Sequence, residues 1–231
     1  MGPLQRWLGA LSTTELASAH LTRTPFAAPG VAEAERALFD WAALARILAA
    51  PTPPEPLIVM RGRHLPLPAP RTGDEARALM DAGIGLVLRR SERSDAGFAA
   101  LARALVDDVP GIAHVQLFVT PARSHGFGWH YDDEDVFIVQ TVGVKDYYFR
   151  ANTVAADEPA RGPVFARFRD ETSPLCTATL VPGDFLYLPA RWWHMAIARD
   201  ESLSISIGVF TDAARARLGI AAPSNQEQHR A

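Results

Sequence analysis

The sequence predicts an α+β protein that is mainly β, with a double-stranded β-helix, or jelly roll, packed against a helical N-terminal region. Before residue 111, apolar residues recur at helical spacing and Ser or Thr stands at capping positions. From Ile112, short runs rich in β-branched and aromatic residues are separated by Gly, Pro or Asp, as in antiparallel sandwiches and barrels. We therefore expect a helical region over 1–111, the β-helix over 112–212 and a tail over 213–231.

Composition restricts the function classes. The chain has 231 residues, of which 48% are hydrophobic and 21% charged, as in a globular protein. The net charge of −3 provides no general attraction to nucleic acid, and the apolar runs are too short to span a membrane. Cys176 is the only cysteine, so an intrachain disulfide or a multi-cysteine zinc site is excluded. The first 20 residues resemble a signal peptide poorly, and we expect a cytoplasmic protein; its oligomeric state stays open.

The N-terminal region should contain several helical segments. Each one begins at a capping residue or carries an apolar stripe: near Ser12, over 32–49, from Thr72 to about Ala82, and from Ser94 to about Val106. The proline-rich stretch 50–56 breaks this pattern, and the apolar run 57–60 after it predicts a strand.

The second half of the chain should form short strands, which we place at 112–119, 128–142, 144–149, 163–169, 176–181, 184–188 and 202–210. The last strand alternates cleanly, so Leu203, Ile205, Ile207 and Val209 should share one face. Ser202, Ser204, Ser206 and Gly208 should then share the other face, which is either solvent-exposed or turned toward a site.

Three residues form a candidate metal site. His130 and Asp132 stand two apart, which on a strand would place both side chains on one face. His194 follows the turn and short strand PGDFLYLPARWW (182–193) and could point into the same barrel interior. Two histidines and one carboxylate form a facial triad that leaves three coordination positions of Fe(II) open. The pair alone is common by chance, but the ordered combination within a β-rich region favours a metal site.

The remaining histidines lack such a context. We expect them to serve packing or to lie at the surface: His20, His64, His114, His125 and His229.

Lys145 is the only lysine among 23 basic residues. A turn at Gly143 would fold residues 144–149 back beside the preceding apolar strand and raise Lys145 into the barrel. A buried ammonium is costly unless an anion meets it, whereas most single lysines are simply solvated.

Residues 112–210 resemble the JmjC-type, cupin-fold oxygenases that use Fe(II) and 2-oxoglutarate. The motifs that carry the resemblance are GWHYDDEDVFIVQTVGVKDYYF (128–149), PGDFLYLPARWWH (182–194) and SLSISIGVF (202–210). The paired Trp192-Trp193 before His194 resembles a feature of the small protein hydroxylases of this family. The resemblance implies that His130, Asp132 and His194 hold Fe(II). It also implies that Lys145 binds the distal carboxylate of 2-oxoglutarate, with O2 as co-substrate.

Three positions depart from the pattern of the family, because the polar side chains expected there are absent: Phe127, Val136 and Gly208. Ser204 and Ser206 are candidates to supply hydroxyl contacts to 2-oxoglutarate instead. The aromatic residues next to the two motifs, Trp129, Tyr131 and Trp193, are candidates to wall the substrate cleft.

The leading functional hypothesis is an Fe(II)- and 2-oxoglutarate-dependent dioxygenase that hydroxylates a C–H bond. The expected substrate is an amino-acid side chain in a peptide or protein, and a free small molecule is the next choice. Demethylation begins with the same hydroxylation step and stays open. Two alternatives remain: a metal-dependent cupin enzyme that does not use 2-oxoglutarate, and a non-catalytic cupin-fold binding module.

Overall fold

The computed structural model describes residues 2–157 and 165–218. The helical segments are α1 (Pro3–Trp7), α2 (Thr13–Glu15), η1 (Leu16–His20), α3 (Glu33–Arg36), α4 (Trp41–Leu48), α5 (Gly73–Asp81), η2 (Ser91–Arg93), α6 (Ala96–Asp108), α7 (Phe165–Phe168) and α8 (Asp212–Leu218). The strands are β1 (Phe26–Ala28), β2 (Glu55–Met60), β3 (Arg63–His64), β4 (Gly85–Arg89), β5 (Gly111–Thr120), β6 (Asp135–Val142), β7 (Lys145–Arg150), β8 (Cys176–Leu180), β9 (Phe185–Leu188), β10 (Trp193–Ala198) and β11 (Ser202–Thr211).

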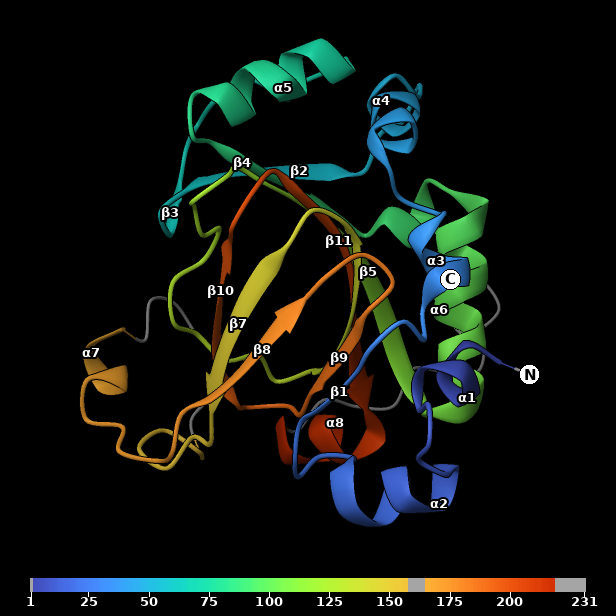
Figure 1. Cartoon of the computed structure of the whole chain (residues 1–231), viewed down its shortest axis with the longest axis vertical. Helices are drawn as coiled ribbons and strands as arrows, with labels where there is room; N and C mark the ends of the chain where they lie inside the picture. Colours follow the sequence, from blue (N-terminus) through green and yellow to red (C-terminus); the bar gives the residue numbers. More distant parts are fainter. Residues whose placement is uncertain (1, 158–164, 219–231) are drawn as a thin grey trace.

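Two antiparallel sheets face each other, which confirms the predicted jelly-roll core (Figure 1). The larger sheet has the order β1-β9-β6-β11-β5-β4-β2-β3, and the smaller one has the order β10-β7-β8. Helix α6 lies beside β5 on the outer side of the larger sheet (Figure 1). The space between the two sheets is where the predicted site residues meet.

Strand β6 contributes to two hydrophobic clusters, one on each of its faces. Phe137 and Val139 point outward and join the large cluster that also contains the N-terminal helices. Val136 and Ile138 point inward and pack against the smaller sheet. A strand buried on both faces needs a nearly continuous apolar run, and residues 136–139 supply one.

The region before residue 112 contains strands as well as helices. Strands β2 and β4 extend the larger sheet, because Leu86 to Leu88 pair with Leu117 to Val119 of β5. The sequence predicted part of β2 at 57–60 but missed β4. The region also contributes helical packing, with Trp7 of α1 stacked on Phe185 at 5.0 Å. The N-terminal region and the β-core therefore share one sheet and one hydrophobic core.

Two of the expected N-terminal helices have different limits. The predicted helix over 32–49 is divided into α3 and α4, because Asp40 adopts an extended backbone and its carboxylate caps Ala43. The last one, α6, starts at Ala96 with Asp95 as its cap, rather than at Ser94. The capping interactions of Ser12 and Thr72 are as predicted.

The β-rich half also differs from the expectation in four places. The predicted strand 128–142 begins only at Asp135, after an acidic stretch with low strand propensity. Within the predicted strand 163–169, residues 163 and 164 lie outside the described residues. Residues 165–168 form helix α7, whose Phe168 stacks on Trp129 at 4.1 Å. Strand β10 was not predicted. The expected tail begins as helix α8, and residues 219–231, including His229, lie outside the described part.

None of the helices within residues 2–157 and 165–218 has both the length and the apolar character needed to cross a bilayer.

Candidate metal centre and its cavity

His130 and His194 are joined through their backbones. His130 lies in the loop before β6, and its N–H donates to the carbonyl of His194 at 3.1 Å. The N–H of His194 donates back to the carbonyl of His130 at 2.8 Å. This antiparallel bridge places the two imidazole rings 4.2 Å apart between centroids. The predicted metal-site residues His130, Asp132 and His194, called the trio below, are therefore brought together by this bridge and not by a continuous strand through residue 132.

Asp132 completes the cluster from the same loop. Its backbone carbonyl accepts a hydrogen bond from the N–H of Arg191 at 2.6 Å, which holds the loop against the start of β10. The carboxylate Oδ2 lies 3.5 Å from Nε2 of His194 and 3.9 Å from Nε2 of His130. One ligand atom from each residue lies within 4.8 Å of the other two, a spacing that can hold a single metal ion.

Backbone carbonyls fix the tautomer of both imidazoles. Nδ1 of His130 donates to the carbonyl of Gly128 at 2.7 Å, and Nδ1 of His194 donates to that of Trp192 at 2.9 Å. A carbonyl only accepts, so Nδ1 carries the hydrogen, and in the neutral form of each ring the lone pair is on Nε2. Burial and the neighbouring His130 lower the pKa of His194 to about 4, which keeps this ring neutral at pH 7. Both Nε2 atoms are therefore ready to bind a metal.

A cavity of about 340 Å³ lies between the two sheets and connects the trio to Lys145. The larger sheet lines it with the small side chains of β11, namely Ser204, Ser206 and Gly208. Leu203, Ile205, Ile207 and Val209 point the opposite way into the large core, as the alternation predicts. The serine face of this strand is thus turned toward a site and not toward bulk solvent.

Lys145 lies at one end of this cavity. Its Nζ donates to Oγ1 of Thr120 at 3.1 Å and to Oγ of Ser204 at 3.2 Å. The side chain is buried, and burial lowers the pKa of Lys145 to about 7. Within the described residues, no carboxylate forms an ion pair with this ammonium. Ser206 lies two residues further along β11, on the same wall.

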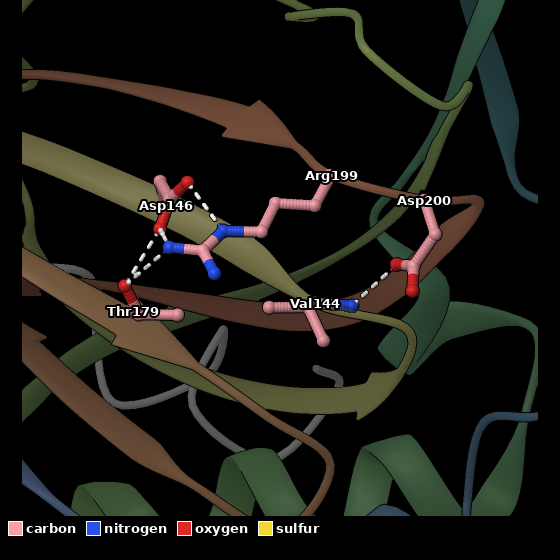
Figure 2. A network of polar contacts seen from close by, with 5 residues as sticks. All are labelled: Val144, Asp146, Thr179, Arg199 and Asp200. Atoms are coloured by element: carbon pink, nitrogen blue, oxygen red, sulfur yellow. Dashed lines mark hydrogen bonds and ion pairs between the residues drawn. The ribbon is translucent and has the colours of Figure 1, made fainter.

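A network around β7 holds the strand that carries Lys145 (Figure 2). Arg199 donates two hydrogen bonds, of 2.7 and 2.8 Å, to the carboxylate of Asp146. Thr179 donates to the same carboxylate at 2.6 Å. These contacts tie β7 to its neighbour β8 and to the end of β10. The turn before β7 depends on Gly143, whose φ of 71° is left-handed and whose Cβ would collide with the carbonyl of Glu201. The strand that positions the ammonium is therefore anchored on both sides.

The aromatic residues predicted to wall the cleft lie elsewhere. Trp129, Tyr131 and Trp193 form a separate cluster in which the rings of Tyr131 and Trp193 meet edge to face at 4.8 Å. Trp193 precedes His194 on β10, so its side chain points away from the cavity by strand alternation. Its Nε1 donates to Glu171 at 3.2 Å. The geometry therefore assigns these three rings to packing behind the metal centre.

The three positions that depart from the family pattern all line the cavity: Phe127, Val136 and Gly208. The ring of Phe127 lies 5.5 Å from that of His130 and 6.1 Å from that of Phe118, so it adds an apolar wall beside the trio.

Tyr147 and Glu134 are two of the cavity residues that the sequence did not single out. Tyr147 lies two residues after Lys145 on the same face of β7, and burial raises the pKa of its hydroxyl. Glu134 lies two residues after Asp132, and burial together with Asp132 raises its pKa to about 7. The two-residue spacing to a predicted site residue was the signal that could have found both.

Of the remaining histidines, none belongs to the metal cluster of the described residues. His64 packs against the ring of Phe127 at 6.4 Å, and His114 lies 3.8 Å from Glu92.

The chain is similar in sequence to several known proteins. The chain is 34% identical over 91 residues to the "Bifunctional lysine-specific demethylase and histidyl-hydroxylase NO66" of Drosophila pseudoobscura pseudoobscura, which covers 39% of this chain and 9% of that protein. It is 32% identical over 110 residues to "Ribosomal oxygenase 1" of Bos taurus, covering 46% of this chain and 16% of that protein. The chain thus spans less than a fifth of the length of these curated relatives.

A solved structure of YcfD, a ribosomal oxygenase from Escherichia coli in complex with cobalt and 2-oxoglutarate, superimposes with a TM-score of 0.61. The sequence identity is 17%, and the match covers 96% of this chain and 54% of that one. At this identity the likeness establishes the fold.

The model of the JmjC domain family matches residues 96–216, a little more than half of the chain. The matched segment runs from α6 to α8 and contains every cavity residue named above. The chain therefore belongs to the JmjC domain family.

Proposed function

We propose that this protein is an Fe(II)- and 2-oxoglutarate-dependent oxygenase that hydroxylates an amino-acid side chain of a peptide or protein. The observation that carries the proposal is the meeting of three metal-ligand side chains and one buried ammonium in a single cavity. Membership of the JmjC domain family supports the same assignment.

The donor set fits a ferrous ion. Two imidazole nitrogens and one carboxylate oxygen converge within 4.8 Å, the combination found in non-haem Fe(II) oxygenases. His130 and His194 would bind through Nε2, since their Nδ1 atoms are already engaged by carbonyls. Asp132 would supply the one negative charge of the set.

The other end of the cavity fits a dicarboxylate. Lys145 offers an ammonium with two hydroxyl partners, Thr120 and Ser204, and the hydroxyl of Tyr147 faces the same space. A volume of about 340 Å³ lies within the range of small-molecule pockets. We assign Lys145 to the distal carboxylate of 2-oxoglutarate and Ser204 to a supporting hydroxyl contact.

When bound, Fe(II) and 2-oxoglutarate supply the oxygen-activating chemistry. The protein orients the two imidazoles through hydrogen bonds from Nδ1 to the carbonyls of Gly128 and Trp192, which leaves Nε2 of each ring for the metal. Lys145 orients the co-substrate, and apolar walls such as Phe118 and Ile138 limit the access of water.

A protein substrate is the choice that the relatives favour. Their names, histidyl-hydroxylase, lysine-specific demethylase and ribosomal oxygenase, all describe enzymes acting on protein residues or on the ribosome. We extend this to the present chain as a proposal.

Succinate release tests the proposed reaction without knowledge of the substrate. The protein should convert ¹³C-labelled 2-oxoglutarate to succinate slowly in the presence of Fe(II) and O2. Asp132→Ala should abolish this turnover, whereas Asp107→Asn, the corresponding loss of charge on an exposed residue of α6, should not. Turnover that persists in Asp132→Ala, or that never occurs in the unmodified protein, would contradict the proposal.

A further inference from the structure

Arg191 adopts a backbone conformation that is unusual for an arginine. It lies in the turn between β9 and β10, three residues before His194, and its φ is 70°. This left-handed region is costly for a residue with a Cβ atom, whereas glycine adopts it freely. Strained residues of this kind persist where the surrounding contacts hold them, and they cluster at functional sites. Arg191 therefore combines backbone strain with a place next to a proposed metal ligand.

The Arg191 side chain holds the loop that carries Asp132. Nη1 of its guanidinium donates to Oδ1 of Asp133 at 2.6 Å, and Nη2 donates to the carbonyl of Ala155 at 3.3 Å. The guanidinium carbon lies 5.6 Å from the centroid of the ring of Tyr131. Only 12% of the Arg191 side chain and 11% of the Asp133 side chain are exposed, so solvent and salt screen this ion pair weakly. One side chain thus contacts the residues on both sides of Asp132.

Asp132 depends on such support more than the two histidines do. Each imidazole is fixed by a hydrogen bond from its Nδ1 to a backbone carbonyl. Within residues 2–157 and 165–218, by contrast, no hydrogen bond reaches the carboxylate of Asp132, and 43% of its side chain is exposed. Its place 3.5 Å from Nε2 of His194 is therefore set by the backbone of the loop, whose carbonyl at Asp132 accepts from the N–H of Arg191.

We propose that Arg191 is a positioning residue of the metal centre. Its guanidinium fixes Asp133 and Tyr131, and the loop held in this way keeps the carboxylate of the intervening Asp132 beside the two imidazoles. Because Arg191 lies three residues before His194 in the chain, it couples the two segments that supply the metal ligands. The inference rests on the proposed metal-binding role of the trio and adds to it a residue outside the cavity. Loss of such indirect support typically lowers metal affinity by about 10-fold to 100-fold.

The charge of Arg191 makes the direction of the effect diagnostic. A positive charge near a cation site repels the metal, so removing that charge would by itself strengthen metal binding. A purely structural residue would change the stability of the fold, but not the affinity of the folded protein for a metal. Only a positioning role predicts weaker metal binding when the guanidinium is removed.

Arg191→Gly removes the side chain and keeps the backbone. Glycine adopts a φ of 70° without strain and retains the N–H that donates to Asp132. Arg123 provides the matched control, because its φ is 55° and its N–H donates at 2.8 Å to the carbonyl of Ala198, at the other end of β10. The side chain of Arg123 is exposed, and it forms no ion pair with any residue that the structure describes.

The experiment titrates the metal-free proteins with Co(II), a stand-in for Fe(II), and follows the visible absorption of the bound ion. The titration gives the affinity, and the shape of the absorption bands reports the coordination geometry. The temperature is kept below the thermal transition of every variant, as measured by circular dichroism. Arg191→Gly should bind Co(II) more weakly than the unmodified protein, by about 10-fold or more, with altered bands at saturation. Arg123→Gly should bind Co(II) as the unmodified protein does.

A Co(II) affinity of Arg191→Gly equal to or above that of the unmodified protein would overturn the inference, as would an equal loss in Arg123→Gly. If Arg191→Gly does not fold, Arg191→Lys decides the question, because an ammonium lacks the planar fork that binds Asp133 and the carbonyl of Ala155 together. Arg191→Lys should bind Co(II) more weakly by about 3-fold or more, and an unchanged affinity would count against the inference. An unmodified protein that binds no Co(II) would contradict the proposed function itself, and the inference with it.

Discussion

His130 and His194 form a reciprocal pair of backbone hydrogen bonds, and this pair is what brings two metal-ligand side chains together from positions 64 residues apart. Each imidazole is then oriented by a hydrogen bond from its Nδ1 to the carbonyl two residues before it, that of Gly128 for His130 and that of Trp192 for His194. The same local arrangement therefore occurs twice around the bridge. It fixes the direction of both Nε2 atoms without requiring any side chain from elsewhere in the fold.

Lys145→Met should separate co-substrate binding from metal binding. Losing one partner of a buried ion pair costs about 3–5 kcal/mol, so the affinity for 2-oxoglutarate should fall by roughly two to three and a half orders of magnitude. Metal affinity should be unchanged, since Lys145 is not a ligand. Lys145→Arg should restore binding only in part, because a planar guanidinium does not replace a compact ammonium. Calorimetric titration of the metal-free protein with Zn(II), and then of the Zn(II)-loaded protein with 2-oxoglutarate, measures the two affinities. An unchanged 2-oxoglutarate affinity in Lys145→Met would place the anchor elsewhere.

The affinity for 2-oxoglutarate should depend on pH through the same residue. Burial lowers the pKa of Lys145 to about 7, so the ammonium is lost from the free protein as the pH rises above 7. The dicarboxylate needs the charged form, and binding above pH 7 must therefore take up a proton. Affinity should fall up to 10-fold per pH unit between pH 7.5 and 9. Titrations in two buffers with different ionisation enthalpies detect the proton uptake, and a flat profile without uptake would refute this role.

Glu171 should stabilise the wall behind the metal centre. Its carboxylate accepts hydrogen bonds from Thr153, Ser173 and Trp193. Burial opposes its ionisation, but these hydrogen bonds outweigh burial and lower the pKa of Glu171 to about 2. Because the folded-state pKa lies below the ordinary value of 4.5, this stabilisation is complete above pH 4.5 and is lost as the pH falls toward 2.

Glu171→Gln should therefore lower the free energy of unfolding at pH 7 by about 1.5–3 kcal/mol. The difference between the variant and the parent should shrink between pH 4.5 and pH 3. Urea denaturation at both pH values measures it, with Asp107→Asn as the exposed control. A difference that stays constant with pH would mean that the charge of Glu171 does not contribute.

A fragment that starts at Ile112 should not fold. It would lack β4, which pairs with β5, and α6, whose Leu101 and Leu105 belong to the large hydrophobic cluster. The exposed edge of β5 and the uncovered apolar face would favour aggregation. Size-exclusion chromatography and circular dichroism of residues 112–231 test this. A soluble fragment with a cooperative thermal transition would show that the β-core is an independent domain.

The sequence identified the residues of the candidate site, but it did not predict the backbone contact that brings them together. His130, Asp132, His194 and Lys145 could be chosen because few side chains serve their chemistry. Their assembly depends on a bridge between a loop and the start of β10, a non-local contact that no periodicity records. Strand β4 was missed for a similar reason, because its pairing partners β2 and β5 lie elsewhere in the chain.

The most direct test of the central claim is an anaerobic titration of the protein with Fe(II) and then 2-oxoglutarate, followed by visible absorption. If the trio binds Fe(II) and the 2-oxo acid chelates it, a metal-to-ligand charge-transfer band should appear at one equivalent of iron. Asp132→Ala should lack the band, and Lys145→Met should need at least 100-fold more 2-oxoglutarate to develop it. A protein that binds iron but gives no band at saturating 2-oxoglutarate, or a band that persists in Asp132→Ala, would contradict the account.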